Sequence, residues 1–456
     1  MQTLIQRFGG FISRAKYKDL SADTIRQAKL LTVDLLGVSI AGLKMDFPRM
    51  MVDYLASQGG VKEATLLGSR KKVPAMHAAL GNGSCGHALD MDDGYRFGGV
   101  HTGVTVIPAA LAYAEANKLD GRSFLLAVVM GFEIVNRLSK AMNPSHLNRG
   151  FHTTGTLGVF GAAAACGVLA GLKEKEMVGA LSLAGLQGAG LLEILNDGAM
   201  AKPIHPGKAG MAGILSVELA KRGAKGPVTV LEGNKGLFNA MADEVNIEEL
   251  FKDLGKHFSI NDMYVKFHAA CRHTHPAIDA ILSIMKEKTL KFEEIDAIDL
   301  VTYPTAISFC GEQEGLPGTA EAAKFSLPYS SAIAAYYGDA SEGRYVPAVV
   351  ANKKIRGLAA RISCGSSEKW RKAYPHQRGA TVTVKTTGKA AHTVEVPLAK
   401  GEPENPASQE DFEAKYYQNT SWIEKRIADA ILEKTLVLDK ADVTDLAGLL
   451  RKIQAF

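Results

Sequence analysis

The sequence predicts a mainly α-helical protein with a smaller α+β part, and three observations lead to this fold class. Ala- and Leu-rich stretches with helical spacing fill residues 1–258. The texture changes after about residue 258, where residues 259–399 contain strand-like, alternating stretches, and helix-type sequence returns in residues 400–456. A chain of 456 residues with 46% hydrophobic residues can build more than one core. We therefore predict a large helical domain, completed by the C-terminal tail, and a smaller α+β domain.

The helices of the first half are predicted from apolar periodicity and end signals. Ser21 suits an N-cap and Gly42 can end the first helix, with apolar residues at helical spacing between them. The uncharged stretch Gly155–Leu172 is mostly Gly and Ala and lacks flanking Trp or Tyr, which favours a packed core helix over a membrane span. Further helices are predicted at Val104–Asn117, Arg122–Asn143, Thr156–Ala170, Lys175–Leu192 and Ala209–Arg222.

The second region has strand-like sequence at Ile295–Tyr303, Thr381–Val384 and His392–Val396. The last two stretches flank the turn-prone Thr387-Gly388-Lys389, so a hairpin is expected there. Beyond the breaker-rich residues 400–406, helices are predicted at Gln409–Ala414 and Ile423–Leu432. We expect this tail to pack back on the helical domain.

Composition excludes several classes of partner. The net charge of +5 is small and is not gathered in a basic tail, so neither nucleic acid nor an anionic membrane is expected, and an anionic substrate suffices. Five scattered cysteines without C-x-x-C spacing favour a reducing, cytoplasmic setting. Met1–Tyr17 lacks the apolar stretch of a secretory signal.

Glycine- and histidine-containing segments interrupt the helices at four places, and loops of this kind often carry function. They span residues 87–103, 150–155, 202–208 and 266–276. A polycarboxylate needs several cations around it and a base for an activated C–H bond. The segments offer Lys202, Lys266 and Arg272 as anion partners, His101 and His152 as acid or base, and Asp90 to orient one histidine.

Metal and nucleotide cofactors are not predicted. The run Asp90-Met91-Asp92-Asp93 could hold Mg²⁺, but a second acidic metal motif is not evident downstream. His273-Thr274-His275 lacks the i, i+4 spacing of a helical zinc pair. No G-x-G-x-x-G motif follows a strand and no P-loop occurs.

The same four segments resemble the MmgE/PrpD family, which includes 2-methylcitrate dehydratase, cis-aconitate decarboxylase and iminodisuccinate epimerase. The resemblance continues through Lys324–Tyr329 and Lys400–Pro406, in the family's order. It implies a large all-helical domain with a smaller α+β lid domain inserted into it, a cofactor-free site at the domain interface and a homodimer.

The resemblance also implies the residues of the site. Asp90, His101, His152, Lys202 and Lys266 match the family's catalytic positions. Substrate binding is assigned to Arg272, His273, Cys271 and His205. Which group is the base and which is the acid stays open.

At two positions the sequence departs from the family's pattern, and both bear on the expected activity. Gly94 stands where many relatives have Thr, and Cys271 stands where decarboxylase relatives carry His. The leading hypothesis is a dehydratase-type lyase that abstracts a proton alpha to a carboxylate of a substrate similar to 2-methylcitrate or aconitate. The alternatives are an epimerase of a polycarboxylate such as iminodisuccinate, and a non-catalytic helical binding protein.

Overall fold

A computed structural model describes residues 2–311 and 315–455 and is mainly α-helical, as predicted. The chain forms two compact units. The first contains the residues up to Ala88, residues 92–264 and residues from 408 onward. The second contains residues 89–91 and 265–407. A role of the second unit as a lid stays a prediction.

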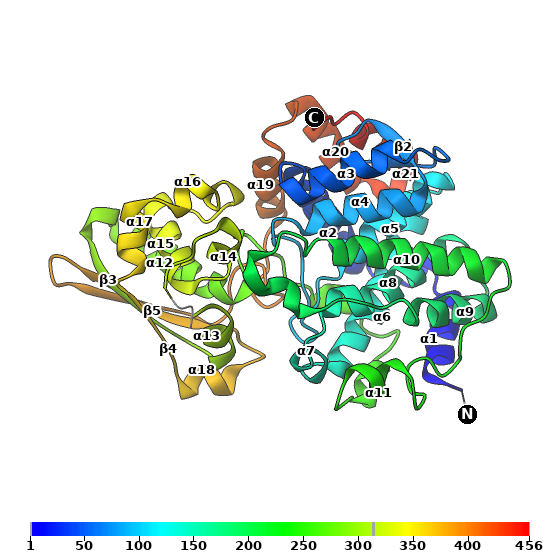
Figure 1. The fold of residues 1–456 in the computed structure, drawn as a ribbon, viewed down its shortest axis with the longest axis horizontal. Coiled ribbons are helices and arrows are strands. Elements are labelled where there is room, and N and C mark those ends of the chain that lie inside the picture. Colours follow the sequence, from blue (N-terminus) through cyan, green and yellow to red (C-terminus); the bar gives the residue numbers. More distant parts are fainter. Residues whose placement is uncertain (1, 312–314, 456) are drawn as a thin grey trace. The chain divides into compact units, whose positions relative to one another are not determined.

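The first unit is built around helix α8, which packs against α5, α6, α9 and α10 (Figure 1). Nearly every residue of α8 is buried, which confirms that this stretch is a core helix. A Cβ atom on Gly161 would lie 2.4 Å from a methyl group of Val135, so the missing side chain lets α6 approach closely. The principal helices of this unit are α1 (Leu4–Arg14), α2 (Ala22–Gly42), α3 (Asp46–Ser57), α4 (Ala75–His87), α5 (Gly103–Ala116), α6 (Gly121–Met142), α7 (Ser145–Asn148), α8 (Thr153–Leu169), α9 (Glu174–Gly185), α10 (Ile204–Lys221), α11 (Leu237–Met241), α19 (Gln409–Thr420), α20 (Lys425–Leu436) and α21 (Val443–Leu450).

The lengths and compositions of the helices test whether any of them could span a membrane. In residues 2–311 and 315–455, none combines the length and the apolar character that a bilayer crossing requires.

The C-terminal tail packs on the helical unit, as predicted. Helix α19 contacts α2, and α21 contacts α5. The Lys415 ammonium lies 2.6 Å from the Asp34 carboxylate, and both side chains are buried. The N-cap of α2 is also confirmed, because the Ser21 hydroxyl accepts the Thr24 amide at 3.1 Å.

The expectation of an all-helical domain is wrong at one place. Strands β1 (Ala64–Leu66) and β2 (Lys71–Val73) form a two-stranded antiparallel sheet in the first unit. Gly68 and Arg70 adopt positive φ angles of 80° and 57°, and these angles allow the tight turn that joins β1 to β2. Strands of three residues carry too little periodicity to be predicted.

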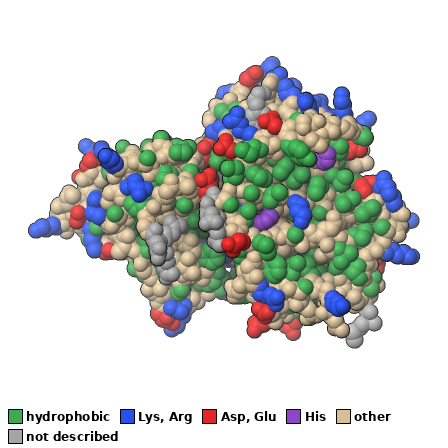
Figure 2. Space-filling model, in the orientation of Figure 1, with side chains coloured by type: hydrophobic (Ala, Val, Ile, Leu, Met, Phe, Trp, Pro, Cys, Tyr) green, Lys and Arg blue, Asp and Glu red, His purple; other side chains and the backbone are tan. Residues whose placement is uncertain are grey.

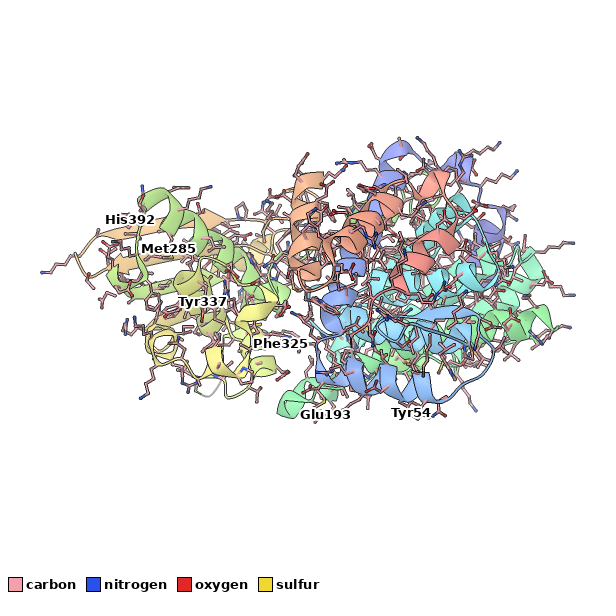
Figure 3. All side chains as sticks on the ribbon, turned by 90° about the horizontal axis from the view of Figure 1, so that it is seen from above. Tyr54, Glu193, Met285, Phe325, Tyr337 and His392 are labelled. Atoms are coloured by element: carbon pink, nitrogen blue, oxygen red, sulfur yellow. The ribbon has the colours of Figure 1, made fainter. Side chains whose placement is uncertain are left out.

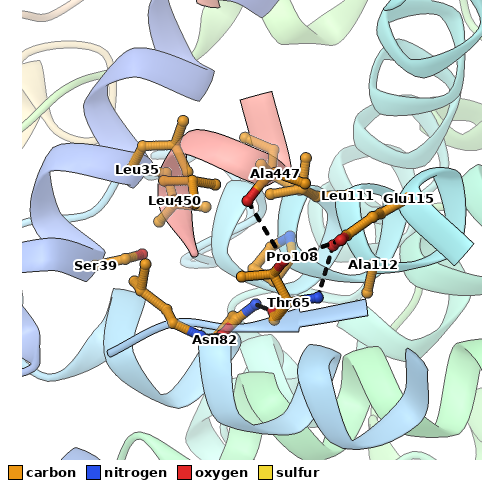
Figure 4. A pocket seen from close by; sticks show the side chains of 13 residues that line it. Leu35, Ser39, Thr65, Asn82, Pro108, Leu111, Ala112, Glu115, Ala447 and Leu450 are labelled. Carbon is orange, nitrogen blue, oxygen red and sulfur yellow. Dashed lines mark hydrogen bonds between the residues drawn. The ribbon is translucent and has the colours of Figure 1, made fainter. Parts of the chain in front are cut away.

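The small sheet is tied to α5 through Glu115 (Figure 4). The Glu115 carboxylate accepts hydrogen bonds from the Thr65 amide at 2.6 Å and from the Thr65 hydroxyl at 2.9 Å. The cavity beside them, also lined by Pro108 and Ala447, has a volume of about 20 Å³. That space suits one water molecule, so this cavity is too small for a polycarboxylate.

The second unit holds a four-stranded sheet in the order β4-β3-β5-β6, in which β3 and β4 are parallel and the other pairs antiparallel. Helix α12 packs on β5 and β6, and Figure 3 labels Met285 of α12 and His392 of β6. The predicted strands correspond to β3, β5 and β6, whereas β4 was not predicted. The elements are α12 (His275–Lys288), β3 (Ile295–Thr302), α13 (Pro304–Cys310), α14 (Ala320–Lys324), α15 (Leu327–Tyr337), α16 (Pro347–Val350), α17 (Lys353–Ala359), β4 (Ile362–Ser366), α18 (Glu368–Ala373), β5 (Ala380–Thr386) and β6 (Ala391–Val396).

The two tryptophans of the chain are divided between the units. Trp370 of α18 is buried in the second unit, and its indole N–H donates to the Thr381 hydroxyl at 3.1 Å. A Cβ atom on Gly379 would lie 2.2 Å from this indole ring, so the tryptophan packs directly on backbone. Trp422 lies in the first unit, between α19 and α20.

Apolar side chains are also exposed on the first unit. Figure 2 shows them gathered over α4 and α10. Tyr54 of α3 is 59% exposed, and Ile204 and Leu219 of α10 are exposed as well. The homodimer implied by the resemblance stays a prediction.

Candidate functional site

Most of the predicted site residues gather in two clusters, one in each unit, together with residues that were not predicted. The histidine cluster of the first unit consists of His87, Asp92, His101, His152 and His205. The lysine cluster of the second unit consists of Asp90, Lys266, Cys271, His273 and Tyr303.

Asp92 binds two histidines from adjoining elements. Its buried carboxylate lies 2.8 Å from Nδ1 of His87, at the end of α4, and 3.3 Å from Nδ1 of His101, just before α5. Although burial raises the pKa of Asp92, the charges and hydrogen bonds of the two histidines hold it well below its usual range. Asp92 is therefore a carboxylate that accepts from both rings.

The ring of His101 is fixed in one tautomer. Its Nδ1 also lies 2.8 Å from the Asp93 backbone oxygen, and this oxygen can only accept. Nδ1 therefore carries a proton, which leaves Nε2 with a lone pair that can take a proton from a substrate. The carboxylate beside His101 is that of Asp92, and orientation of a histidine by Asp90 stays a prediction.

Asp93 adds a buried acid to the start of α5. Its Oδ1 accepts the Gly103 amide at 2.9 Å, and a Cβ atom on Gly103 would come 2.3 Å from Oδ2. Burial raises the pKa of Asp93 well above its usual value, and the negative charges of Asp92 and Asp34 add to the effect. Asp93 therefore holds a proton more readily than an ordinary carboxylic acid, beside an ionised Asp92.

His152 and His205 share a short hydrogen bond. His152 precedes α8 and His205 lies in the first turn of α10, with their Nδ1 atoms 2.8 Å apart. Burial lowers the pKa of His152 well below its usual value, and the positive charge of Lys202 lowers it further. Lys202 therefore acts on the histidines electrostatically, and His152 is neutral at pH 7.

His87 links the two halves of the histidine cluster, although the sequence analysis assigned it no role. Its ring centre lies 4.9 Å from that of His101 and 5.8 Å from that of His152, which it stacks on. Burial lowers its pKa to about 4. The four imidazoles therefore form one continuous group of rings, and two of them, His87 and His101, contact the ionised Asp92.

Lys266 and Asp90 form the centre of the lysine cluster. Lys266 is 1% exposed, and its ammonium donates to the backbone oxygen and to the carboxylate of Asp90, both at 2.9 Å. Asp90 has a φ of 55°, which is uncommon for a residue other than glycine. Strained backbone of this kind is often found at functional sites.

His273 and Cys271 lie beside this ion pair. Nδ1 of His273 lies 2.5 Å from the Tyr303 hydroxyl. Burial lowers the pKa of His273 to about 3, and the charges of Arg378 and Lys266 contribute. A hydrogen bond with Cys310 lowers the pKa of Cys271, against the effect of burial.

Arg272 is held by protein acceptors. Its buried guanidinium donates twice to Glu402, at 3.1 and 2.9 Å, and once to Nδ1 of His275 at 3.1 Å. These contacts join residues 266–276 to the 400–406 segment and favour a positioning role. Substrate binding by Arg272 stays a prediction.

Gly94 is explained by Tyr264. The two residues exchange backbone hydrogen bonds of 3.0 and 2.9 Å, and a Cβ atom on Gly94 would lie 2.3 Å from the Tyr264 hydroxyl oxygen. The tyrosine therefore fills the space that a threonine side chain at position 94 would need.

One group in the described part of the chain has metal-ligand geometry. The donor atoms of His87, Asp92 and His101 lie within 4.8 Å of one another. An ion there would displace the N–H bonds that Asp92 accepts, so the contacts favour a hydrogen-bonded group. Metal independence stays a prediction.

One hollow of the first unit lies away from these residues. It has a volume of about 520 Å³ and is lined by Arg7, Arg14, Phe251 and neighbours. None of the predicted site residues lines it.

Both parts of the chain match models of a known protein family. The MmgE/PrpD N-terminal domain matches residues 6–250, and the MmgE/PrpD C-terminal domain matches residues 268–439. The cis-aconitate decarboxylase-like protein oryM of Aspergillus oryzae is 25% identical over 465 residues, covering 96% of this chain and 95% of that protein. The cis-aconitate decarboxylases of Mus musculus and Homo sapiens are 28% and 27% identical, over 63% of this chain and 59% and 60% of theirs.

Proposed function

Because the chain belongs to the MmgE/PrpD family, we propose that it is a cofactor-independent lyase of dehydratase type acting on a small polycarboxylate similar to 2-methylcitrate or aconitate. One observation carries the proposal. His101, which contacts the Asp92 carboxylate, and the neutral, buried His152 lie in the same cluster. Two imidazoles beside an ionised carboxylate are suited to moving protons at neutral pH.

The proposed reaction uses these groups as follows. One imidazole takes the proton alpha to a carboxylate, and the electron pair of that C–H bond becomes the new C=C bond. A second proton donor protonates the departing hydroxyl, which leaves as water. The positive charges of Lys202 and Lys266 suit substrate carboxylates and the charge that develops as the proton leaves. His273, Cys271 and Arg272 remain proposed for substrate binding.

Decarboxylation is the second candidate, because the relatives described above are named for it. There, CO₂ leaves and the resulting carbanion takes a proton at carbon. An epimerase would remove the proton alpha to a carboxylate and return a proton to the opposite face of the carbanion. Dehydration and epimerisation need a base, decarboxylation needs a proton donor at carbon, and all three benefit from a cationic site.

The experiment is incubation with 2-methylcitrate, cis-aconitate and iminodisuccinate in D₂O, followed by NMR. Dehydration gives an alkene from a saturated hydroxy acid, and decarboxylation releases CO₂. Epimerisation places deuterium in recovered substrate without an alkene. A thermal shift with one of the three compounds in the absence of turnover would favour a non-catalytic binding protein.

The proposed acid and base are tested by substitution on whichever compound is turned over. General acid–base groups contribute about 10²–10⁴-fold, so His101→Ala and His152→Ala should each lower kcat by that factor. His257→Ala and His376→Ala serve as controls outside the histidine cluster. Near-normal kcat in both cluster variants would move the base to Lys202, Lys266 or Cys271.

A further inference from the structure

The bond between His152 and His205 joins two like atoms. Both atoms are Nδ1, and they lie 2.8 Å apart. A hydrogen bond between two ring nitrogens needs one donor and one acceptor, so a single proton lies between them. Burial lowers the pKa of both rings, and nearby lysine charges add to this effect, so the pair is neutral overall.

The position of that proton determines what His152 can do. When it resides on His152, Nε2 of that ring has a lone pair and acts as a base. When it resides on His205, neutral His152 must carry its proton on Nε2 and acts as an acid. The two rings change tautomer together, because each neutral imidazole holds one proton.

We propose that His205 is the proton-transfer partner that switches His152 between base and acid. As Nε2 of His152 gains a proton from the substrate, the shared proton moves to Nδ1 of His205, and Nε2 of His205 releases a proton to water. The reverse sequence resets the pair. One proton enters and one leaves, so the charge of the pair does not change. This inference rests on the proposed function and gives His205 a role other than substrate binding.

The packing around the pair supports this role. His152 is 5% exposed, whereas His205 is half-buried on the first turn of α10, which lies beside α8 (Figure 1). The more accessible ring is therefore the one that can exchange protons with water. A Cβ atom on Gly155 would lie 2.7 Å from the Ala189 oxygen and 3.1 Å from Cβ of His205, so glycine at this position keeps the two rings close.

The test is His205→Gln, whose amide can still form a hydrogen bond but cannot relay a proton. We expect kcat to fall at least tenfold in dilute buffer and to recover as imidazole is added. His257→Gln, at an exposed histidine, is the matched control and should show neither change. A kcat that does not fall, or a fall that no concentration of imidazole restores in a protein of unchanged melting temperature, would overturn the proposal.

A second measurement does not depend on turnover. In protein labelled with ¹⁵N-histidine, a scalar coupling across the Nδ1 to Nδ1 bond should appear and should vanish in His205→Gln. If the coupling is present but no polycarboxylate reacts, the proposed function is wrong, whereas the inference that His152 and His205 share a proton is retained. If turnover is normal and the coupling is absent, the inference about His205 fails alone.

Discussion

Replacing Asp92 with asparagine should slow catalysis without unfolding the protein. The asparagine side chain keeps the shape of the aspartate but loses the charge that accepts N–H groups from His87 and His101. The imidazolium that forms when His101 takes a proton then lacks its counter-charge. His101 keeps its 2.8 Å bond to the Asp93 backbone oxygen, so its tautomer survives. The loss is therefore partial.

The size of the effect follows from these contacts. A hydrogen bond to a charged group is worth about 1.5–3 kcal/mol. Because about 1.36 kcal/mol corresponds to a factor of ten in rate, Asp92→Asn should lower kcat by roughly 10- to 150-fold. A loss this large exceeds the scatter of steady-state kinetics and reaches at most the lower end of the loss of about 10²–10⁴-fold expected on removing an imidazole.

The assay is steady-state kinetics on a confirmed substrate, together with a thermal melt. Asp262→Asn is the matched control, because Asp262 lies 2.9 Å from Nε2 of the exposed His257 and forms the same kind of pair at the surface. The control should keep its kcat. An Asp92→Asn protein with a normal melting temperature and a kcat within about threefold of wild type would refute the assignment of Asp92.

Three other predictions concern stability and cofactors. Lys415→Met should lower the free energy of unfolding by about 3 kcal/mol in urea titrations, because it leaves Asp34 buried without its cation; a loss below about 1 kcal/mol would contradict this. Burial raises the pKa of Asp34 to about 6, so its stabilising contribution is complete below pH 3.8 and is lost as pH rises through about 6. The stability difference between wild type and Asp34→Asn should therefore shift by about 3 kcal/mol across that window; a constant difference would show that Asp34 does not titrate there. Extensive chelation should leave turnover unchanged, and loss restored by Mg²⁺ or Zn²⁺ would assign an ion to His87, Asp92 and His101.

Local sequence signals predicted most of the helices, because apolar periodicity and end signals act over a few residues. Ser21 caps α2 as expected. The helix predicted to reach Leu192 instead ends at Gly185, because the apolar residues beyond it, such as Leu186 and Leu191, are exposed rather than packed. Strand β4 has the mixed sequence Ile-Ser-Cys-Gly-Ser, and its pairing with β3 is long-range.

The candidate site was predicted by segment but not by contact. The sequence could not show that aspartates two residues apart have different partners, since the positive φ of Asp90 redirects the chain between them. Asp90 meets Lys266, whereas Asp92 meets His87 and His101. Tyr303, Cys310 and Arg378 reach the lysine cluster from distant positions, and no local pattern marks them.

The division of the two tryptophans gives each unit its own optical reporter. In Trp422→Phe, intrinsic tryptophan fluorescence comes only from Trp370, whose buried indole should shift to longer wavelength when the second unit unfolds. Trp370→Phe would report the first unit, although the loss of the Thr381 hydrogen bond must be checked by circular dichroism. Denaturation curves of the two variants would show whether the units melt in one cooperative transition or in two, and hence whether a single unfolding free energy describes the chain.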